Sequence, residues 1–348
     1  MLHGQELPDE RISKKKKIYP VNTQLREYLI SHNRSLPLPI TYADLLKFEG
    51  SIPVYDKKGK DTLWETPLYN HLDLQTIHEG LKKIYSILKT EGDSSVHKHL
   101  EVERLDYCTF GNSNPFRIKI VNNFNDNYDY FYIKQADASR IYGLELEHIL
   151  SPSRIHFYVD GATLVEEHIA GIPGDAFIAN YLNNPEFNKV RIAKEFVKFN
   201  ERCFVRLLGD MRSYNYVFDI TPDFEEVQFR IRAIDFDQQS YEGRKNLYLP
   251  QYFKENYNLV KLVQEKLTPD SVEQYQVEEQ TLIARRSKSS HIRLYALLNI
   301  MAKDDISPQE KVLQMAHELA AHYHDNGFLE QHTMGDLVKY SLEILQTK

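Results

Sequence analysis

The sequence predicts an α+β fold in which a small antiparallel sheet is followed by a larger helical part. Between residues 105 and 170, short segments rich in β-branched and aromatic residues alternate with turn sequences, which is typical of antiparallel strands. After Gly174, apolar residues recur at helical spacing almost to the end of the chain. Because the first 100 residues follow neither pattern for long, we divide the chain into an N-terminal mixed extension (1–100), a sheet-bearing lobe (101–170) and a helical lobe (171–348).

The N-terminal extension is predicted to contain three helices, although its residues assign it no role. The segment Asn22–Ile30 has Thr23 as a candidate N-cap, and Tyr42–Phe48 is predicted to form a second helix. Asp73–Leu88 carries apolar residues three and four positions apart, which predicts an amphipathic helix. The segment 91–95, which contains glycine and serine, is then expected to be a linker.

The sheet-bearing lobe is predicted to begin with three strands in an antiparallel meander, at 105–110, 115–121 and 130–134. In the second of these, Phe116 and Ile118 alternate with the charged residues Arg117 and Lys119, which indicates one buried and one polar face. A helix over 139–150 follows. Two further strands, 155–159 and 163–169, are joined by a tight turn at Asp160-Gly161.

The helical lobe is predicted to be organised around one central helix. Its expected buried face is Val190, Ala193, Val197, Asn200, Phe204 and Leu207, which recur at three- and four-residue spacing. Four or five further helices are predicted between residue 251 and the end of the chain.

Composition favours a soluble cytoplasmic protein. A net charge of −7 argues against a nucleic-acid backbone as the main partner. Cys108 and Cys203 are the only cysteines, which are too few for a disulfide framework or a four-cysteine zinc site and indicate a reducing compartment. The N-terminus lacks the basic and apolar pattern of a signal peptide, and no run of about 18 apolar residues predicts a membrane span. We therefore expect no membrane partner.

Three short motifs follow one another along the chain. Lys134 ends a predicted strand. Gly209-Asp210 comes after the central helix and precedes Asn215 and a further apolar strand. Asp235 then ends a second short strand, in the sequence Ile-Asp-Phe-Asp.

In this order the motifs resemble those of the protein-kinase-like superfamily, and in particular its aminoglycoside phosphotransferase and HipA-like branches. These families carry a strand lysine, a Gly-Asp-x-x-x-x-Asn loop and an Ile-Asp-Phe/Trp turn. The resemblance covers roughly residues 105–348 and implies a two-lobed kinase-like fold that binds ATP and Mg²⁺. It also implies transfer of a phosphoryl group to a hydroxyl of a small molecule or a protein, an acceptor that no motif identifies.

The resemblance assigns a role to each matching residue. Asp210 would be the catalytic base that orients the acceptor hydroxyl, and Asn215 and Asp235 would hold magnesium, which prefers oxygen ligands. Lys134 would grip the α- and β-phosphates, paired with a glutamate of the following helix. Residues with further implied contacts to the nucleotide are Gly111 in the loop over the phosphates, Glu145 as the lysine's partner, and Glu167 and His168 in the segment between the lobes.

Several alternatives remain open at this stage. Glu147 is a second candidate partner for Lys134, and Asp237 is a candidate to join Asp235 at the metal or to support it. Leu208 stands where the kinase families usually have histidine, and the loop over the phosphates has a single glycine. These departures leave a pseudokinase, which would bind nucleotide or a protein partner without turnover, as the alternative function. An unrelated binding protein is the third reading.

A zinc-protease helix is not expected, although His317-Glu318 precedes His322 and His324. Zinc binding of that type needs two histidines four residues apart on one helix face. His317 and His322 are five apart and therefore diverge on a helix of 3.6 residues per turn.

Overall fold

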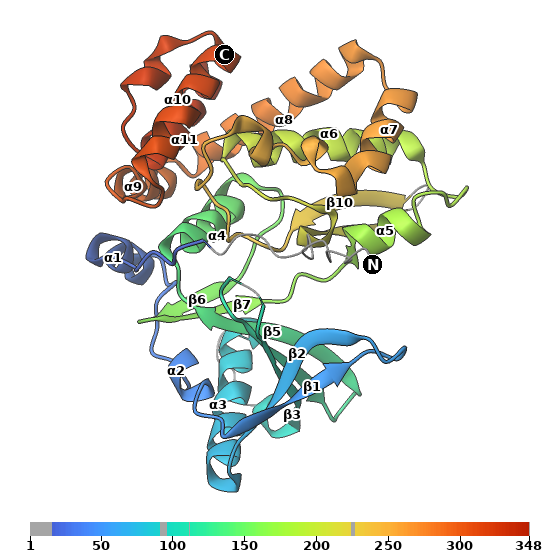
Figure 1. Ribbon diagram of the computed structural model, residues 1–348, viewed down its shortest axis with the longest axis vertical. Helices are drawn as coiled ribbons and strands as arrows, with labels where there is room; N and C mark the ends of the chain where they lie inside the picture. Colours follow the sequence, from blue (N-terminus) through green and yellow to red (C-terminus); the bar gives the residue numbers. More distant parts are fainter. Residues whose placement is uncertain (1–15, 91–95, 111, 224–226, 348) are drawn as a thin grey trace, which may run out of the picture. The chain divides into compact units, whose positions relative to one another are not determined.

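The computed structural model describes residues 16–90, 96–110, 112–223 and 227–347. The chain forms two compact units, each built from separate segments (Figure 1). The first, which we call the sheet unit, contains Pro37–Ala136 and Tyr158–Glu166 together with residues 16–18. The second, the helical unit, contains Tyr19–Leu36, Asp137–Phe157 and the chain from Glu167 onward. The two units are described separately.

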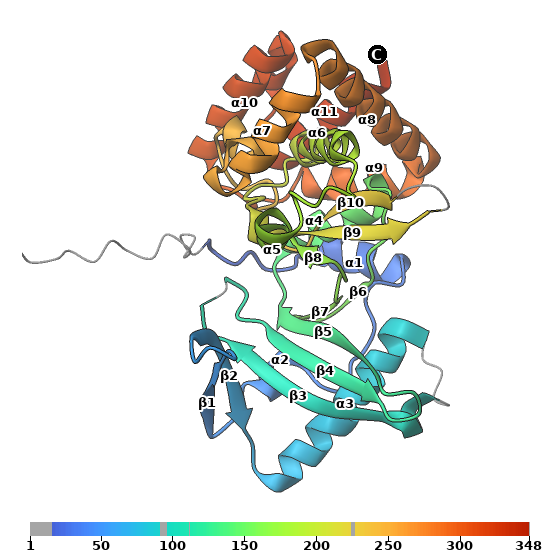
Figure 2. The same ribbon diagram turned by 90° about the vertical axis from the view of Figure 1, so that its right-hand side faces the viewer.

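The sheet unit is built on a seven-stranded sheet in which the strand order is β1-β2-β3-β4-β5-β7-β6 (Figure 2). The strands are β1 (Gly50–Tyr55), β2 (Asp61–Leu68), β3 (Leu100–Cys108), β4 (Phe116–Asn122), β5 (Asn127–Gln135), β6 (Phe157–Asp160) and β7 (Thr163–Glu167). A 3₁₀ turn, η1 (Val96–His99), precedes β3. The predicted antiparallel meander of three strands is confirmed as β3, β4 and β5, which pair antiparallel in this order.

Alternation along β4 separates a buried face from a polar face. Phe116, Ile118 and Ile120 are buried, whereas the intervening side chains are partly exposed. Across the antiparallel pair, Ile118 lies opposite Phe131 of β5. Directly opposed apolar side chains of this kind stabilise a register, because a slip by one residue would turn every apolar side chain toward the other face.

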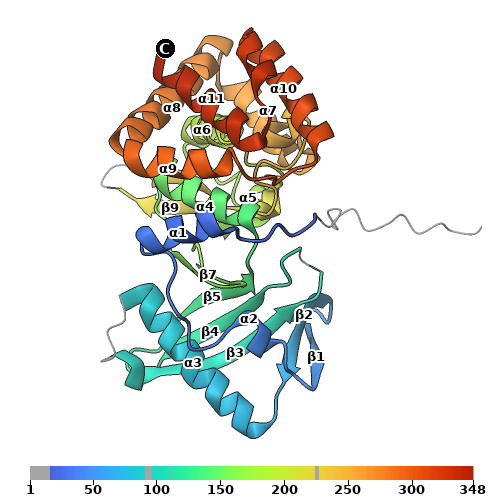
Figure 3. The same ribbon diagram turned by 90° about the vertical axis from the view of Figure 1, so that its left-hand side faces the viewer.

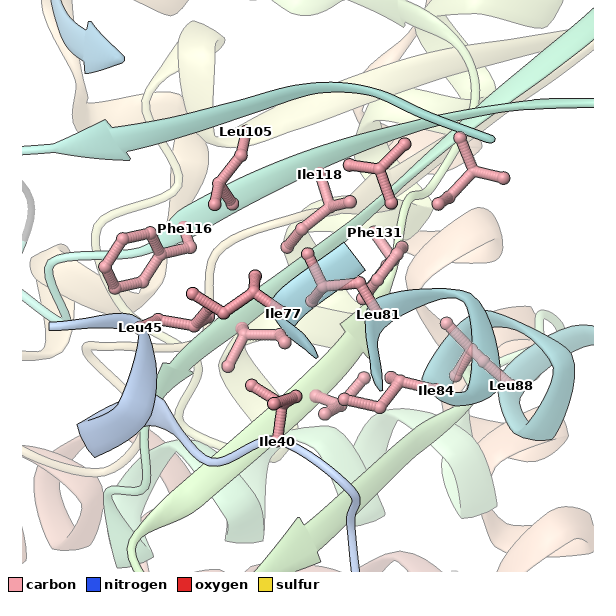
Figure 4. Close-up of a cluster of buried hydrophobic side chains, with 14 of the residues drawn as sticks. Ile40, Leu45, Ile77, Leu81, Ile84, Leu88, Leu105, Phe116, Ile118 and Phe131 are labelled. Carbon is pink, nitrogen blue, oxygen red and sulfur yellow. The ribbon is translucent and has the colours of Figure 1, made fainter. Parts of the chain in front are cut away.

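One face of the sheet is covered by α3 (His71–Thr90) and by the short α2 (Tyr42–Leu45). Figure 4 shows Ile77, Leu81, Ile84 and Leu88 of α3 directed toward Ile118, Phe131 and Leu105 of the strands. Full burial of one such side chain stabilises the folded state by roughly 1.5–3 kcal/mol. The helix predicted at 73–88 is therefore an integral part of the core of the sheet unit.

Gly80 lets the chain before α2 approach α3 closely. A Cβ atom at this position would lie 2.1 Å from Cγ1 of Ile40, which is far closer than van der Waals contact. Ile40 is buried in the same core. The capping box of Thr41 and Asp44 then starts α2 directly after this contact.

The hairpin of β1 and β2 is the element of the sheet that the sequence analysis did not predict. Most of its side chains are partly or fully exposed, and β1 contains a proline, Pro53. The hairpin joins the rest of the sheet through Trp64 and Glu65, which pair with Cys108 and Tyr107. Residues 50–90 therefore share a compact unit with β3–β5, whereas Tyr19–Leu36 belongs to the helical unit.

The helical unit contains nine α-helices within the described ranges and a three-stranded sheet of order β10-β9-β8 (Figure 1). The helices are α1 (Thr23–Ser31), α4 (Ala138–Leu150), α5 (Gly174–Asn180), α6 (Lys189–Val205), α7 (Tyr257–Lys266), α8 (Pro269–Ser289), α9 (His291–Met301), α10 (Gln309–Tyr323) and α11 (Met334–Thr347). The strands are β8 (Ile172–Pro173), β9 (Tyr216–Pro222) and β10 (Val227–Ala233). The 3₁₀ turns are η2 (Ser213–Asn215), η3 (Lys245–Tyr248), η4 (Pro250–Tyr252), η5 (Lys254–Asn256) and η6 (Asn326–Glu330). The prediction of four or five helices after residue 251 is confirmed.

The central helix α6 is buried around more of its circumference than the single apolar face predicted from the sequence. Ala193, Val197 and Phe204 are buried as expected, but Val190 is 43% exposed. From Phe196 to Val205, nearly every side chain is buried, including the charged ones. A helix that is enclosed on several sides does not show a single apolar face.

Two N-caps fix the starts of α1 and α6. Asn22, and not Thr23 as predicted, caps α1, because its side-chain oxygen accepts from the Leu25 N–H at 2.8 Å. Thr23 is the first helical residue. Asn188 caps α6 in the same way. Figure 3 shows α1 beside α4 and α9 within the helical unit.

Among the residues that the structure describes, no helix combines the length and the apolar character needed to cross a membrane.

Candidate functional site

The loop between α6 and β9 holds Asp210 in a backbone conformation that L-residues rarely adopt. Leu207 and Asp210 have φ values of 53° and 58°, in the left-handed region. Such conformations cost on the order of 1–3 kcal/mol each and persist only where the surroundings enforce them. Here the Gly209 N–H donates to the Gln238 carbonyl at 3.1 Å, and the Asp210 N–H donates to the Leu247 carbonyl at 3.0 Å. Two neighbouring segments therefore fix the orientation of Asp210.

Asn215 closes this loop back onto Asp210. Its side-chain Nδ2 donates to the Asp210 carbonyl at 2.7 Å and lies 3.4 Å from Asp210 Oδ2. The Asn215 N–H donates to the Arg212 carbonyl at 2.9 Å. The five-residue spacing from acid to amide is thus a compact loop with the two side chains in contact.

The hairpin of β9 and β10 brings Asp235 to the same place. Ala233 pairs with Tyr216 at the end of the ladder, and the Ile234 N–H donates to the Asn215 carbonyl at 3.0 Å. Asp235 is the next residue in the chain. The nineteen residues between Asn215 and Asp235 therefore belong to a hairpin whose open end carries both side chains.

Burial raises the pKa of Asp210 to about 6, and the nearby acids Asp235 and Glu255 act in the same direction. Arg212 opposes this shift, because its guanidinium lies 2.8 Å from Asp210 Oδ1 and favours the ionised carboxylate. Arg212 also pairs with Glu255 at 2.8 Å. The carboxyl group of Asp210 is therefore poised to gain or lose a proton slightly below neutral pH.

Arg140 is a member of this cluster that the sequence analysis missed. The side chain is only 1% exposed, and its Nη1 lies 2.8 Å from Asp235 Oδ1 and 2.5 Å from Asp237 Oδ1. The Asp237 N–H also donates to Asp235 Oδ1 at 3.0 Å. Asp237 therefore shares a cation with Asp235. Arginine in a helix is usually read as a solvated residue, so nothing in the local sequence signalled this contact.

The oxygen atoms of the side chains near Asp235 suit magnesium, which also binds water and phosphate, better than a metal ion whose ligands all come from the protein. Across the described ranges, no three or more His, Cys, Asp or Glu side chains converge in a way that suits a metal ion. The hairpin instead offers the amide of Asn215 and the carboxylate of Asp235, which is 35% exposed. Magnesium typically takes one or two protein oxygens together with water and substrate phosphates. These two residues fit that requirement.

The strand lysine of the sheet unit has a partner other than the one predicted. Lys134 of β5 lies 2.8 Å from Glu166 of the neighbouring β7, and both side chains are at least nine-tenths buried. The predicted partners are bonded elsewhere within the helical unit. Glu145 accepts from Arg34 at 3.0 Å and from Arg293 at 2.7 Å.

Glu147 is likewise paired, with Arg206. Within the sheet unit Lys134 thus contacts a strand glutamate, and its pairing with a helix glutamate stays a prediction. The physical reason is the strand order, because β7 lies directly beside β5 in the sheet. Alternate side chains of adjacent strands share one face, so a lysine and a glutamate there meet without a helix.

The remaining predicted contacts to nucleotide lie in two places. Glu167 Oε1 accepts from the His156 N–H at 2.7 Å, and the Glu167 N–H donates to the His156 carbonyl. One boundary between the two units falls between Glu166 and Glu167. His168, the residue after Glu167, is partly buried. Gly111 lies outside the described residues.

Glu318 and His322, two residues of the segment compared above with a zinc-protease helix, contact other elements of the helical unit. Glu318 accepts from the Lys245 N–H at 2.6 Å. The ring of His322 packs edge-on against Phe204, with 4.8 Å between ring centroids. Both side chains thus link α10 to other parts of the helical unit.

Comparisons with known proteins give a limited result. No family model matches the sequence, and no curated protein matches it either. Among solved structures, the chain is similar to an ethanolamine kinase of Plasmodium vivax, with 13% identity and a TM-score of 0.27 over 81% of this chain and 91% of that one. It is also similar to the autoinhibited serine kinase domain of the giant muscle protein titin, with 12% identity and a TM-score of 0.28 over 71% of this chain and 93% of that one. A titin kinase structure with its flanking domains gives 12% identity and a TM-score of 0.25, covering 71% and 55%. Similarity at this level assigns the chain to no family.

Proposed function

We propose that this protein is an ATP- and Mg²⁺-dependent phosphotransferase with a protein-kinase-like fold, acting on a hydroxyl group. The proposal rests on one relationship in the helical unit. The side chain of Asn215 holds the Asp210 loop, while its carbonyl accepts from the residue before Asp235. Phosphoryl transfer asks a protein mainly to position its reactants and to offset charge on phosphate oxygens. A base, an amide and a second carboxylate held together in this way suit that task.

Asp210 is proposed as the base that accepts the proton of the acceptor hydroxyl. A general base works best when its pKa lies near the working pH, and burial raises the pKa of Asp210 to about 6. The carboxylate is thus mostly ionised at neutral pH yet more basic than an ordinary aspartate. Arg212 holds the side chain in place through its contact at 2.8 Å.

Asn215 and Asp235 are proposed to bind magnesium through oxygen atoms. When bound, the ion would offset the negative charge of the nucleotide phosphates. Within the chain, the hairpin register holds the two residues at one end of β9 and β10. The preference of magnesium for oxygen ligands makes them the natural pair.

Lys134 is proposed to bind phosphate oxygens of the nucleotide. Its ammonium group lies 2.8 Å from Glu166, which holds the lysine side chain in place on the sheet. The backbone of Glu167 and His168 is proposed to contact adenine, as the resemblance implies. The carboxylate and the N–H of Glu167 are both bonded to the backbone of His156, which holds this segment in place.

A pseudokinase is the second candidate, and one specific observation favours it. Arg140 is bonded to both Asp235 and Asp237, so a cation of the chain itself already neutralises part of the proposed metal site. A protein that binds nucleotide without turnover would be compatible with that arrangement. The intact Asp210, Asn215 and Asp235 favour the enzyme.

An assay of ADP formation and of label transfer from γ-labelled ATP separates the two candidates. The wild type and Asp210→Asn would be incubated with Mg²⁺-ATP, alone to detect autophosphorylation and with a panel of hydroxyl compounds that includes amino alcohols. The net charge of −7 makes cationic acceptors a sensible first choice. We expect turnover that falls at least about 100-fold in Asp210→Asn, the usual contribution of a general base. Equal turnover in both proteins would refute the assignment of Asp210, and nucleotide binding without turnover in either would favour the pseudokinase.

A further inference from the structure

Asn256 stands at the N-cap position of α7, but its side chain does not cap that helix. Asparagine is one of the residues preferred at N-caps, because its side-chain oxygen can accept from a backbone N–H of the first turn. Asn22 and Asn188 make this bond at the starts of α1 and α6. The side chain of Asn256 makes no such bond with α7. It is therefore committed to other partners.

Those partners include the two ends of the candidate catalytic loop. Asn256 is fully buried. Its Nδ2 donates to the Met211 carbonyl at 2.9 Å and to the Pro250 carbonyl at 2.7 Å, and its Oδ1 accepts from the Tyr216 hydroxyl at 2.7 Å. Met211 directly follows the proposed base in the chain, and Tyr216 directly follows the proposed amide ligand of magnesium. One amide group thus joins both ends of the loop to the segment before α7.

The preceding residue, Glu255, reaches the same loop by a second route. Its Oε1 accepts from Arg212 Nη1 at 2.8 Å, and Arg212 Nε donates to Asp210 Oδ1 at 2.8 Å. Two consecutive residues therefore act on the proposed base. Glu255 holds the Asp210 side chain through Arg212, and Asn256 holds the backbone that comes directly after it.

We propose that Asn256 is a positioning residue, which fixes the loop so that Asp210 stays where a base for the acceptor hydroxyl is needed. This inference rests on the proposed function. Asp210 has a left-handed backbone conformation, with φ at 58°, which persists only where the surroundings enforce it. Displacement of a catalytic group by about 1 Å can lower a rate roughly 100-fold. Asn256 acts through the Met211 carbonyl and has no role in the proton transfer itself.

Hydrogen–deuterium exchange measures the state of the loop without any measurement of activity. In the wild type the N–H groups of Asp210 and Asn215 donate to backbone carbonyls and are expected to exchange slowly. Asn256→Asp keeps the size of the side chain but places a carboxylate oxygen against two carbonyls. We expect peptides covering residues 207–216 to exchange at least about 10-fold faster, as for loss of a buried hydrogen bond. Peptides of α9 are expected to exchange as in the wild type.

Asn200→Asp is the matched control, because it makes the same change at another buried asparagine of the helical unit. The Nδ2 of Asn200 donates to the Phe196 carbonyl at 2.7 Å, a bond that aspartate loses. Its Oδ1 accepts from the Gln251 N–H at 2.8 Å, a bond that aspartate keeps. Neither bond goes to the loop, so exchange of residues 207–216 is expected to stay as in the wild type.

Steady-state phosphotransfer provides the second readout, at a temperature at which thermal unfolding shows every variant to be fully folded. Asn256→Asp is expected to lower kcat at least about 10-fold, because the base is displaced. KM for ATP is expected to stay close to the wild-type value, because no side-chain bond of Asn256 goes to a residue proposed to bind ATP or Mg²⁺. Asn200→Asp is expected to leave both constants unchanged.

Each outcome decides a different point. Unchanged exchange of residues 207–216 in a folded Asn256→Asp would overturn the inference and leave the proposed function intact. Faster exchange with an unchanged kcat, or an equal effect of Asn200→Asp, would also overturn it. No phosphotransfer in the wild type would overturn the proposed function, and the inference with it.

Tyr216→Phe decides the case if Asn256→Asp does not fold. It removes only the hydroxyl group that donates to Asn256 Oδ1 and keeps the aromatic ring. Faster exchange of residues 207–216 together with a lower kcat would support the inference. Exchange and kcat that both stay at their wild-type values would contradict it.

Discussion

Lys134 and Glu166 form a buried ion pair 2.8 Å apart on neighbouring strands, β5 and β7. Both members come from the sheet, so the lysine is oriented without a contribution from a helix. A buried pair of this kind is costly to break, because removal of one partner leaves an uncompensated charge. This makes the pair an informative site for testing the proposed phosphate contact separately from the stability of the sheet.

Lys134→Met is expected to have two effects that a second substitution separates. Alone it removes the Lys134 cation from the buried Glu166 carboxylate, which is expected to lower the free energy of unfolding by about 3–5 kcal/mol. The double variant Lys134→Met/Glu166→Gln removes both charges and is expected to regain most of that stability. Urea unfolding monitored by circular dichroism measures this difference.

The affinity for ATP is expected to be lower in the double variant than in the wild type, because the variant lacks the ammonium group of Lys134. A charge-assisted hydrogen bond to phosphate contributes about 1.5–3 kcal/mol, which corresponds to roughly a 10- to 100-fold loss in affinity for ATP. Calorimetric titration with Mg²⁺-ATP checks this expectation. Wild-type affinity in the stable double variant would contradict a phosphate contact of Lys134.

The pH dependence of phosphotransfer is expected to follow Asp210. A base must be deprotonated to act, so kcat/KM is expected to rise with pH through the Asp210 pKa of about 6 and then level off. Arg212 lowers this pKa, and its replacement in Arg212→Gln is therefore expected to move the acidic limb of the profile to higher pH.

Arg212→Lys serves as the control, because it keeps a positive charge beside Asp210. Its acidic limb is expected to lie between those of the wild type and Arg212→Gln. The pH at the midpoint of the acidic limb is determined separately from any change in the maximal value of kcat/KM. An acidic limb that stays in place in Arg212→Gln would show that another group governs the profile.

Glu145 is expected to contribute to stability and not to nucleotide binding, since it joins three elements of the helical unit. It accepts from Arg34 beyond α1 and from Arg293 of α9, and its side chain is fully buried. Glu145→Ala leaves both guanidinium groups without this carboxylate and is expected to lower the free energy of unfolding by about 3–5 kcal/mol. Urea unfolding again provides the measurement.

Glu265→Ala on α7 is the matched control for this substitution. Glu265 pairs with Lys261 across one helical turn and is 53% exposed, so its loss is expected to change the free energy of unfolding by no more than about 0.5 kcal/mol. Similar effects of the two substitutions would contradict the role assigned to Glu145. A loss of ATP affinity in a fully folded Glu145→Ala would indicate instead that Glu145 contributes to nucleotide binding.

Local sequence patterns were sufficient to predict the strands and helices that carry the candidate site. The alternation around Phe116 and Ile118 predicted β4, and the turn sequences on either side of it predicted the meander. These features depend on residues close together in the chain. The hairpin of β1 and β2 lacked such a pattern, because most of its side chains are partly or fully exposed and β1 contains Pro53, a residue that is uncommon in strands.

Contacts that depend on how the strands and helices are arranged in space could not be predicted from the sequence. Glu166 meets Lys134 because β7 lies beside β5, ahead of β6 in the sheet order. Arg140 meets Asp235 across a separation of 95 residues. Neither contact has a local signature, since a glutamate in a strand and an arginine in a helix are both read as surface residues.

The measurement that tests the central claim most directly is calorimetric titration of ATP into the wild type and Asp235→Asn, each in Mg²⁺ and in EDTA. The account predicts that the wild type binds ATP more tightly in Mg²⁺ than in EDTA, and that Asp235→Asn loses most of this difference while remaining folded. A wild-type protein that binds no ATP in either condition would contradict the account.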